Sequence, residues 1–185
     1  MRENLRQILI NEPGDVWFFV YGSLMWNPGF EPKEKRKALL RGWHRRFCVA
    51  STEFRGTFKK PGLSFGLDCG GSCRGLAFCI AESDRDEIFT YLEKREMKEN
   101  IYKCRKVKVS TEVAEIFAYT LTVNRDHKLY VASKEIDKIV HKIREAKGIK
   151  GKNKDYLELT VKHLDRLGIK DKLLHTILKK VVSIA

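Results

Sequence analysis

The chain has 185 residues, 43% of them hydrophobic, enough for one sizeable core, so we expect a single domain over 1–185 with a short N-terminal extension over 1–14. The formal net charge is +13, but acidic residues are interspersed with the basic ones, which indicates a solvated basic surface and no nucleic-acid partner. No apolar run reaches the length of a membrane span and no signal peptide opens the chain, so the sequence predicts a cytoplasmic protein without a membrane partner.

The first half of the chain predicts a short helix followed by strands. An apolar run that starts at Val16 predicts a buried strand, which breaks at Gly22-Ser23. Two later strands are expected to form a hairpin across Gly70-Gly71. The expected elements are a helix over 1–10 and strands over 16–21, 45–52, 63–67 and 74–81.

The second half predicts further strands and then helices. Ser83 and Asp86 are spaced as a capping box that opens a helix. Strands are expected over 102–109 and 116–123, and helices over 133–146, after an N-cap at Asn153, and after Asp171. These elements predict the α+β class, as a small, mostly antiparallel β-barrel or sheet with flanking helices.

Metal binding is not indicated by the cysteines or the histidines. Cys69 and Cys73 are not spaced as a zinc pair, and no second pair or nearby histidine completes a ligand set. The odd cysteine count argues against a disulfide framework. We therefore expect no metal site, and leave open a redox role for Cys69 and Cys73.

The break after the first strand is a candidate binding site. A strand that leaves the core at Gly22-Ser23 exposes consecutive backbone amides, and glycine lets a ligand approach them closely. Such amides suit a carboxylate or a developing oxyanion. A Gly-Ser dipeptide after a strand is usually a plain turn, so the interpretation as a binding site depends on a second stretch of the chain.

That second stretch is the end of the helix that starts near residue 83. Ile88, Leu92 and Glu96 are four residues apart, so they share one helix face, and the first two belong to its apolar stripe. A carboxylate on that stripe faces the core or a cleft, where burial and the helix terminus raise its pKa toward that of a general base. The alternative is a solvated Glu96, or one paired with Arg95 or Lys103.

The two stretches resemble the signature of the ChaC-type γ-glutamylcyclotransferases. The resemblance covers nearly the whole chain after about residue 15, and the segment Phe58-Lys59-Lys60 departs from it. The matching segments, in order, are Tyr21-Gly22-Ser23-Leu24, Arg45-Arg46-Phe47, Arg55-Gly56-Thr57, Gly71-Ser72-Cys73-Arg74-Gly75, Arg95-Glu96-Met97, Asn124-Arg125, Asp155-Tyr156-Leu157 and Leu167-Gly168-Ile169.

The resemblance implies a small β-barrel with flanking helices and cyclisation of a γ-glutamyl group to 5-oxoproline. The implied substrate is glutathione, with Cys-Gly as the second product, no cofactor, and Glu96 as the catalytic residue. The implied pocket is the strand end and turn, and we add two candidates from their positions in the chain. The predicted substrate-binding residues are Phe19, Val20, Tyr21, Gly22, Ser23, Leu24, Arg55 and Tyr102. Arg46 and Ser51 are weaker candidates.

Three alternatives remain open at this point. The chain is a cyclotransferase for another γ-glutamyl amine or amino acid, a catalytically silent ligand-binding homologue, or a nucleic-acid-binding protein. Both Glu96 and the Gly22-Ser23 turn are present, which argues against the silent homologue. The oligomeric state is not predicted.

Overall fold

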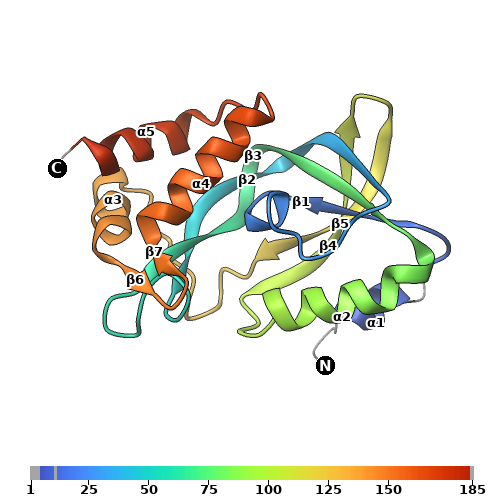
Figure 1. Cartoon of the computed structure of the whole chain (residues 1–185), viewed down its shortest axis with the longest axis horizontal. Helices are drawn as coiled ribbons and strands as arrows, with labels where there is room; N and C mark the ends of the chain where they lie inside the picture. Colours follow the sequence, from blue (N-terminus) through green and yellow to red (C-terminus); the bar gives the residue numbers. More distant parts are fainter. Residues whose placement is uncertain (1–4, 11, 184–185) are drawn as a thin grey trace. The chain divides into compact units, whose positions relative to one another are not determined.

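Five strands of the computed structural model form one closed barrel, in the hydrogen-bonded order β1-β3-β2-β4-β5 (Figure 1). The structure describes residues 5–10 and 12–183. The predicted α+β class with a barrel is confirmed. The strands are β1 (Val16–Val20), β2 (Glu34–Ser51), β3 (Gly62–Ile80), β4 (Tyr102–Thr111) and β5 (Glu115–Val123).

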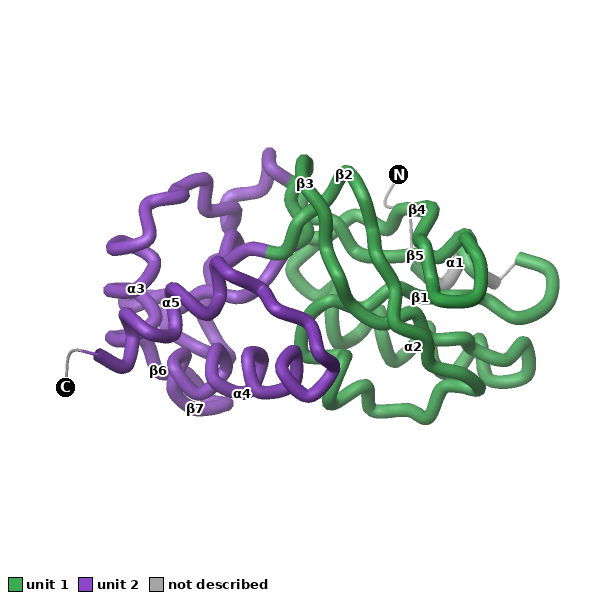
Figure 2. Tube along the Cα trace, turned by 90° about the horizontal axis from the view of Figure 1, so that it is seen from above, with its two compact units in different colours: residues 1–45, 67–124 green, residues 46–66, 125–185 purple. Residues whose placement is uncertain are grey.

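The chain forms two compact units, each built from two separate segments (Figure 2). Unit 1 takes residues 1–45 and 67–124, and unit 2 takes residues 46–66 and 125–185. β2 and β3 each contribute residues to both units. The single domain expected over 1–185 stays a prediction.

β1 is an interior strand of unit 1. It pairs antiparallel with β3 along its whole length and parallel with β5 where Phe18 faces Tyr119. The side chains of Phe18, Phe19 and Val20 are at most 1% exposed. A strand that is covered on both faces has to be apolar throughout, which explains the unbroken apolar run in the sequence.

The hairpin predicted at Gly70-Gly71 is wrong, because β3 runs through both glycines as one strand. Their φ angles of 95° and 68° bend the strand without reversing it. The bend lies against β2, where His44 Nδ1 is 2.8 Å from the carbonyl oxygen of Gly70. β2 also begins earlier than the predicted strand over 45–52. The prediction missed its first residues because they are largely charged and exposed and lack an apolar pattern.

Helix α1 (Leu5–Ile10) confirms the predicted N-terminal helix, with Leu5 and Leu9 fully buried. The start of that prediction, residues 1–4, lies outside the described residues. Helix α2 (Arg85–Glu96) is also confirmed, but its predicted capping box is wrong. The chain enters α2 through a 3₁₀ turn over 82–84, and the hydroxyl of Ser83 donates to the side chain of Asp84 instead of accepting from a helix amide.

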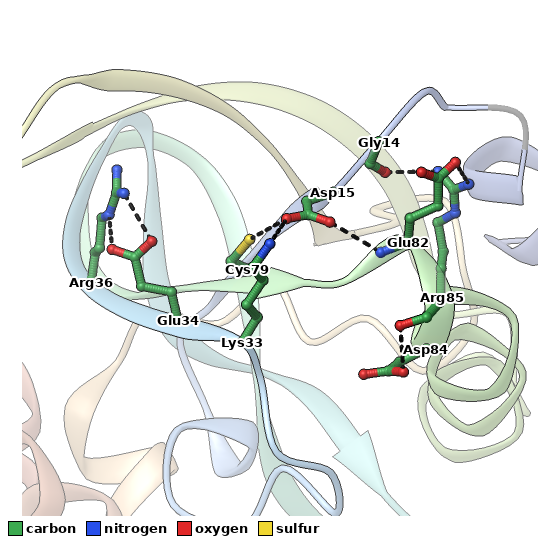
Figure 3. A network of polar contacts seen from close by, with 10 residues as sticks. Gly14, Asp15, Lys33, Glu34, Arg36, Cys79, Glu82, Asp84 and Arg85 are labelled. Atoms are coloured by element: carbon green, nitrogen blue, oxygen red, sulfur yellow. Dashed lines mark hydrogen bonds and ion pairs between the residues drawn. The ribbon is translucent and has the colours of Figure 1, made fainter.

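A polar network fixes the segment before β1 to the start of α2 (Figure 3). The guanidinium of Arg85, which is 8% exposed, donates to the carbonyl oxygen of Gly14 at 3.1 Å. The carboxylate of Asp15 accepts from Lys33 Nζ at 2.6 Å and from the amide of Glu82 at 3.1 Å. The hydrogen bond from Lys33 lowers the pKa of Asp15. These contacts position β1 at its entry, opposite the end that carries the candidate turn.

Unit 2 holds the predicted C-terminal helices and a short hairpin that the sequence did not predict. Asn153 is the first residue of α4 and not the N-cap expected for it. Its fully buried amide group instead bonds the main chain of Leu63, accepting from N at 2.6 Å and donating to O at 2.8 Å. The elements are α3 (Ile136–Glu145), β6 (Lys147–Gly148), β7 (Gly151–Lys152), α4 (Asn153–Arg166) and α5 (Lys172–Val182).

The start of α5 is confirmed, because the side chain of Asp171 caps it by accepting from the amide of Leu174. The centre of unit 2 is aromatic: the ring centroids of Phe47 and Phe65 are 4.1 Å apart, and those of Phe65 and Tyr156 are 5.2 Å apart. Within the part of the chain that the structure describes, none of the helices has the length and apolar character needed to cross a bilayer.

Candidate active site

The turn after β1 is held from two sides. The hydroxyl of Tyr21 donates to the carbonyl oxygen of Leu121 on β5 at 2.9 Å, and the carbonyl oxygen of Tyr21 accepts from Arg45 Nη1 at 2.7 Å. Gly22 then begins a 3₁₀ turn over Ser23–Met25. The first amides of a 3₁₀ turn have no acceptor within the turn itself. The consecutive amides that the sequence predicted after β1 are therefore present, at the start of a short helical turn.

Close packing behind this turn requires a glycine on β3. A Cβ on Gly75 would lie 2.3 Å from the carbonyl oxygen of Val20 and 3.0 Å from the ring of Phe19. The predicted binding residues Phe19 and Val20 are therefore core side chains, and only their main-chain groups are able to meet a ligand. The side chain of Leu24, at 8% exposed, is also buried.

The carboxylate of Glu96 lies at the end of α2, on the face that the sequence predicted. Ile88 and Leu92 are 6% and 0% exposed, and the side chain of Glu96 is 21% exposed. Its Oε1 atom forms an ion pair of 2.9 Å with Nε of Arg95. The predicted inward face and the alternative of pairing with Arg95 are thus both observed.

Arg95 joins Glu96 to the turn. Its Nη2 atom donates to Ser23 Oγ at 3.1 Å, so one guanidinium contacts both the turn and the carboxylate. Its Nη1 atom donates to the carbonyl oxygen of Asn27 at 2.7 Å and to the hydroxyl of Tyr91 at 2.8 Å. The structure therefore brings together two candidate site residues that are far apart in the sequence.

The electrostatics of this cluster follow from its two charges. The guanidinium of Arg95 and the carboxylate of Glu96 carry opposite charges and lie 2.9 Å apart. A carboxylate is one of the groups that serve as a general base. The hydroxyl of Ser23 and the amides of the turn supply hydrogen-bonding groups near the same guanidinium, so the cluster combines a proton acceptor with polar groups that suit a negatively charged or polar ligand.

Sequence analysis missed the roles of Arg95 and Arg45. Arg95 precedes a candidate acid on an exposed helix end, where an arginine is normally solvated. Arg45 is 4% exposed and donates to the carbonyl oxygens of Tyr21 and Arg74. The available signal was that Arg45 and Arg46 directly precede the apolar run Phe47-Cys48-Val49, because a guanidinium that is buried with such a run has to find acceptors.

Tyr102 lies in the same unit as Glu96. It is the first residue of β4, faces Val123 on β5, and is partly exposed. Asn100, with a φ of 53°, makes the connection between α2 and β4. Tyr102 thus follows Glu96 closely, as the sequence implied, and its role in covering the site stays a prediction.

Arg55 belongs to unit 2. Its Nη1 atom donates to the carbonyl oxygens of Lys150 and Lys152, and its guanidinium lies 5.3 Å from the ring centroid of Tyr156. The hydroxyl of Ser51 accepts from the amide of Arg55. Both side chains thus have structural partners in unit 2, and their predicted binding roles stay predictions.

Arg46, the other weak candidate, is also engaged in unit 2. Its Nη2 atom donates to the carbonyl oxygens of Val131, Ala132 and Ser133 at 3.2, 3.1 and 2.7 Å. No cluster of three histidine, cysteine or acidic side chains that would hold a metal ion occurs among the described residues.

Comparison with known proteins gives the family. A family model described as ChaC-like protein matches residues 16–184. A "Glutathione-specific gamma-glutamylcyclotransferase" from Escherichia coli (strain K12) is 34% identical over 171 residues, which cover 92% of this chain and 74% of that protein. The human "Glutathione-specific gamma-glutamylcyclotransferase 1" is 31% identical over 153 residues, which cover 79% of this chain and 68% of that protein.

A solved structure supports the fold. The crystal structure of a γ-glutamylcyclotransferase specific to glutathione from yeast matches with a TM-score of 0.85 at 21% identity, and the match covers 92% of this chain and 96% of that chain. At this level of identity the match shows a shared fold. With the family model covering almost the whole sequence, the chain belongs to the ChaC-like protein family.

Proposed function

We propose that this protein is a glutathione-specific γ-glutamylcyclotransferase, which converts the γ-glutamyl group to 5-oxoproline and releases Cys-Gly. The names of its bacterial and human relatives support this substrate. The observation that carries the proposal is the guanidinium of Arg95, which contacts both the hydroxyl of Ser23 and the carboxylate of Glu96. The proposed binding turn and the proposed proton acceptor thus share one contacting guanidinium.

The reaction needs one group that accepts and returns a proton. The α-amine of the substrate gives a proton to Glu96 and attacks the γ-carbonyl carbon, which forms the five-membered ring. The amide bond to the cysteinyl residue breaks, and Glu96 returns the proton to the departing amine. Because ring closure is intramolecular, the enzyme mainly has to hold the substrate in its folded conformer.

The turn over Tyr21–Leu24 is the proposed binding element. Its amides lie at the start of the 3₁₀ turn and would hold the substrate carboxylate or the developing oxyanion. Loss of one oxyanion donor typically costs about 3 kcal/mol in the transition state. Phe19 and Val20 contribute through their main chain, and Tyr102 is proposed to cover the bound substrate.

Release of 5-oxoproline from glutathione by the purified protein tests the proposal. We expect turnover by the wild type and a loss of at least about 1,000-fold for Glu96→Gln, which keeps the shape of the side chain but cannot accept the proton. Glu93→Gln is the matched control, because it changes a carboxylate one turn earlier on α2, off the Ile88, Leu92 and Glu96 stripe. Circular dichroism establishes that each variant is folded.

The outcomes separate the alternatives. Turnover of another γ-glutamyl compound, but not of glutathione, would leave the chemistry in place and make the substrate wrong. Full activity of Glu96→Gln would refute the mechanism. Absence of any turnover, with γ-glutamyl ligands still binding, would favour a silent homologue. The cytoplasmic location stays a prediction.

A further inference from the structure

Two segments of unit 2 that are distant in the sequence lie side by side (Figure 1). One is residues 53–61, in the loop between β2 and β3, and the other is the β6–β7 hairpin, residues 147–152. The amides of Ile149 and Lys150 donate to the carbonyl oxygens of Glu53 and Phe54, each at 3.0 Å. The guanidinium of Arg55 adds bonds to the hairpin carbonyls.

These segments expose large apolar side chains to solvent. Phe58 is 90% exposed, Ile149 is 73% exposed and Phe54 is 37% exposed. Single exposed apolar residues are common, but a group of them on adjoining loops marks an interaction surface. The loop holding Phe58 is also the segment where the sequence departs from the family pattern.

Basic side chains surround the apolar ones. The two segments together contain six basic residues and one acidic residue, Glu53. The lysines are exposed, although Lys60 also lies 3.4 Å from Glu145 on α3, and Lys150 Nζ lies 4.8 Å from the ring centroid of Phe54. We call this surface the basic aromatic patch: Phe54, Phe58, Lys59, Lys60, Lys147, Ile149, Lys150 and Lys152.

The backbone under the patch is closely packed. A Cβ on Gly56 would lie 2.1 Å from the amide nitrogen of Gly62, and a Cβ on Gly148 would lie 2.4 Å from the carbonyl oxygen of Glu53. The loop and hairpin are therefore fixed in place, so the exposed side chains are presented on an ordered base and their binding costs less conformational entropy.

We propose that the basic aromatic patch binds the surface of an anionic lipid bilayer. Phe58 and Ile149 would enter the boundary between head groups and acyl chains, while the lysines remain at the level of the phosphates. Attraction of lysines to anionic lipids adds to the apolar contribution. Binding of this kind requires no membrane-spanning segment. The sequence analysis predicted no membrane partner because it searched only for an apolar run long enough to span a bilayer, and surface binding leaves no such run.

The composition of the patch favours a bilayer over a nucleic acid. Nucleic-acid sites typically combine stacking aromatic rings with arginines on the phosphates. The arginine here, Arg55, donates its Nη1 hydrogen bonds to the carbonyl oxygens of Lys150 and Lys152. The remaining cations are flexible lysines around apolar side chains, a combination that suits an interface without fixed geometry.

Sedimentation of the full-length protein with lipid vesicles tests the proposal. We expect binding to vesicles rich in phosphatidylserine and not to pure phosphatidylcholine, weakening as ionic strength rises. Phe58→Ser combined with Ile149→Ser should lower the partition coefficient at least about tenfold. Lys59→Gln should lower it about fivefold, because one cation near an anionic surface is lost.

The matched control is Phe117→Ser on β5. Phe117 is 63% exposed, but it lies in unit 1, two residues from Glu115 and outside the basic aromatic patch. Unchanged binding of this control, with weakened binding of the patch variants, supports the proposal. Equal sedimentation with both lipids, no effect of the patch variants, or binding to RNA that the patch variants abolish while vesicles are not bound, would each overturn it. Glutathione turnover does not enter this test.

Discussion

Replacing Arg95 by lysine tests whether one guanidinium organises the candidate site. The substitution keeps the positive charge but replaces a planar fork of donors by a single ammonium. In the structure the fork reaches Glu96, Ser23 and Asn27 from three nitrogens. One ammonium nitrogen cannot occupy all three positions, so at least two of these contacts are lost.

The magnitude follows from the burial and number of those contacts. The side chain of Arg95 is 20% exposed, and hydrogen bonds to charged groups contribute about 1.5 kcal/mol or more each. Loss of two predicts a destabilisation of about 3 kcal/mol, or a decrease in Tm of about 6–12 °C for a chain of this size. A carboxylate displaced by about 1 Å predicts a loss of kcat of about 100-fold.

Thermal unfolding and 5-oxoproline release, measured on the same preparations, check both numbers. Tyr91→Phe is the matched control, because it removes one 2.8 Å contact of Arg95 and leaves the contacts with Glu96 and Ser23 intact. Its kcat should stay within about threefold of the wild type. If Arg95→Lys also kept kcat within that range while Glu96→Gln was inactive, Arg95 would not position the carboxylate and the reasoning would be refuted.

Three further predictions concern unit 2. Asn153→Asp removes the donor to Leu63 O and places a charge at a fully buried position, so urea unfolding should show a loss of about 3 kcal/mol. The pKa of His175 is raised, first by its hydrogen bond to the carbonyl oxygen of Asp171 and also by Asp165, so protonated His175 stabilises the fold fully below pH 6.5 and loses this effect as the pH rises through its folded-state pKa. His175→Gln should remove this pH dependence from a plot of unfolding free energy against pH. If the plot for the variant matched that of the wild type, His175 would not contribute to the pH dependence. Asp171→Ala removes the cap of α5 and should lower the free energy of unfolding by about 1 kcal/mol, seen in the same urea titration.

The sequence predicted elements where apolar periodicity decides the structure. The strand at Val16 and the helix through Ile88 and Leu92 are buried as expected. The hairpin at Gly70-Gly71 failed because glycines with positive φ serve equally in a bend within a strand, and only pairing with a distant strand distinguishes the two. The N-cap at Asn153 failed because its side chain bonds a segment that is remote in sequence.

The candidate site was also predictable only in part, because local spacing can be recognised in a sequence and long-range contacts cannot. Local spacing placed Glu96 on the buried stripe of α2, and the break after β1 was visible as Gly22-Ser23. The link between them was not predictable, because it is a long-range contact made by Arg95, whose own neighbours on the helix suggest a solvated side chain. Local patterns thus identified two parts of the site but not the residue that joins them.

The parallel pairing of Phe18 with Tyr119 means that β1 can complete its hydrogen bonding only after β5 has been synthesised. β1 leaves the ribosome early, but its second neighbour, β5, is among the last strands to be made. Pairings this far apart in sequence form slowly, and meanwhile β1 has an open, strongly apolar edge. A product truncated before Glu115 would keep that edge exposed, so we expect such fragments to aggregate or to depend on chaperones.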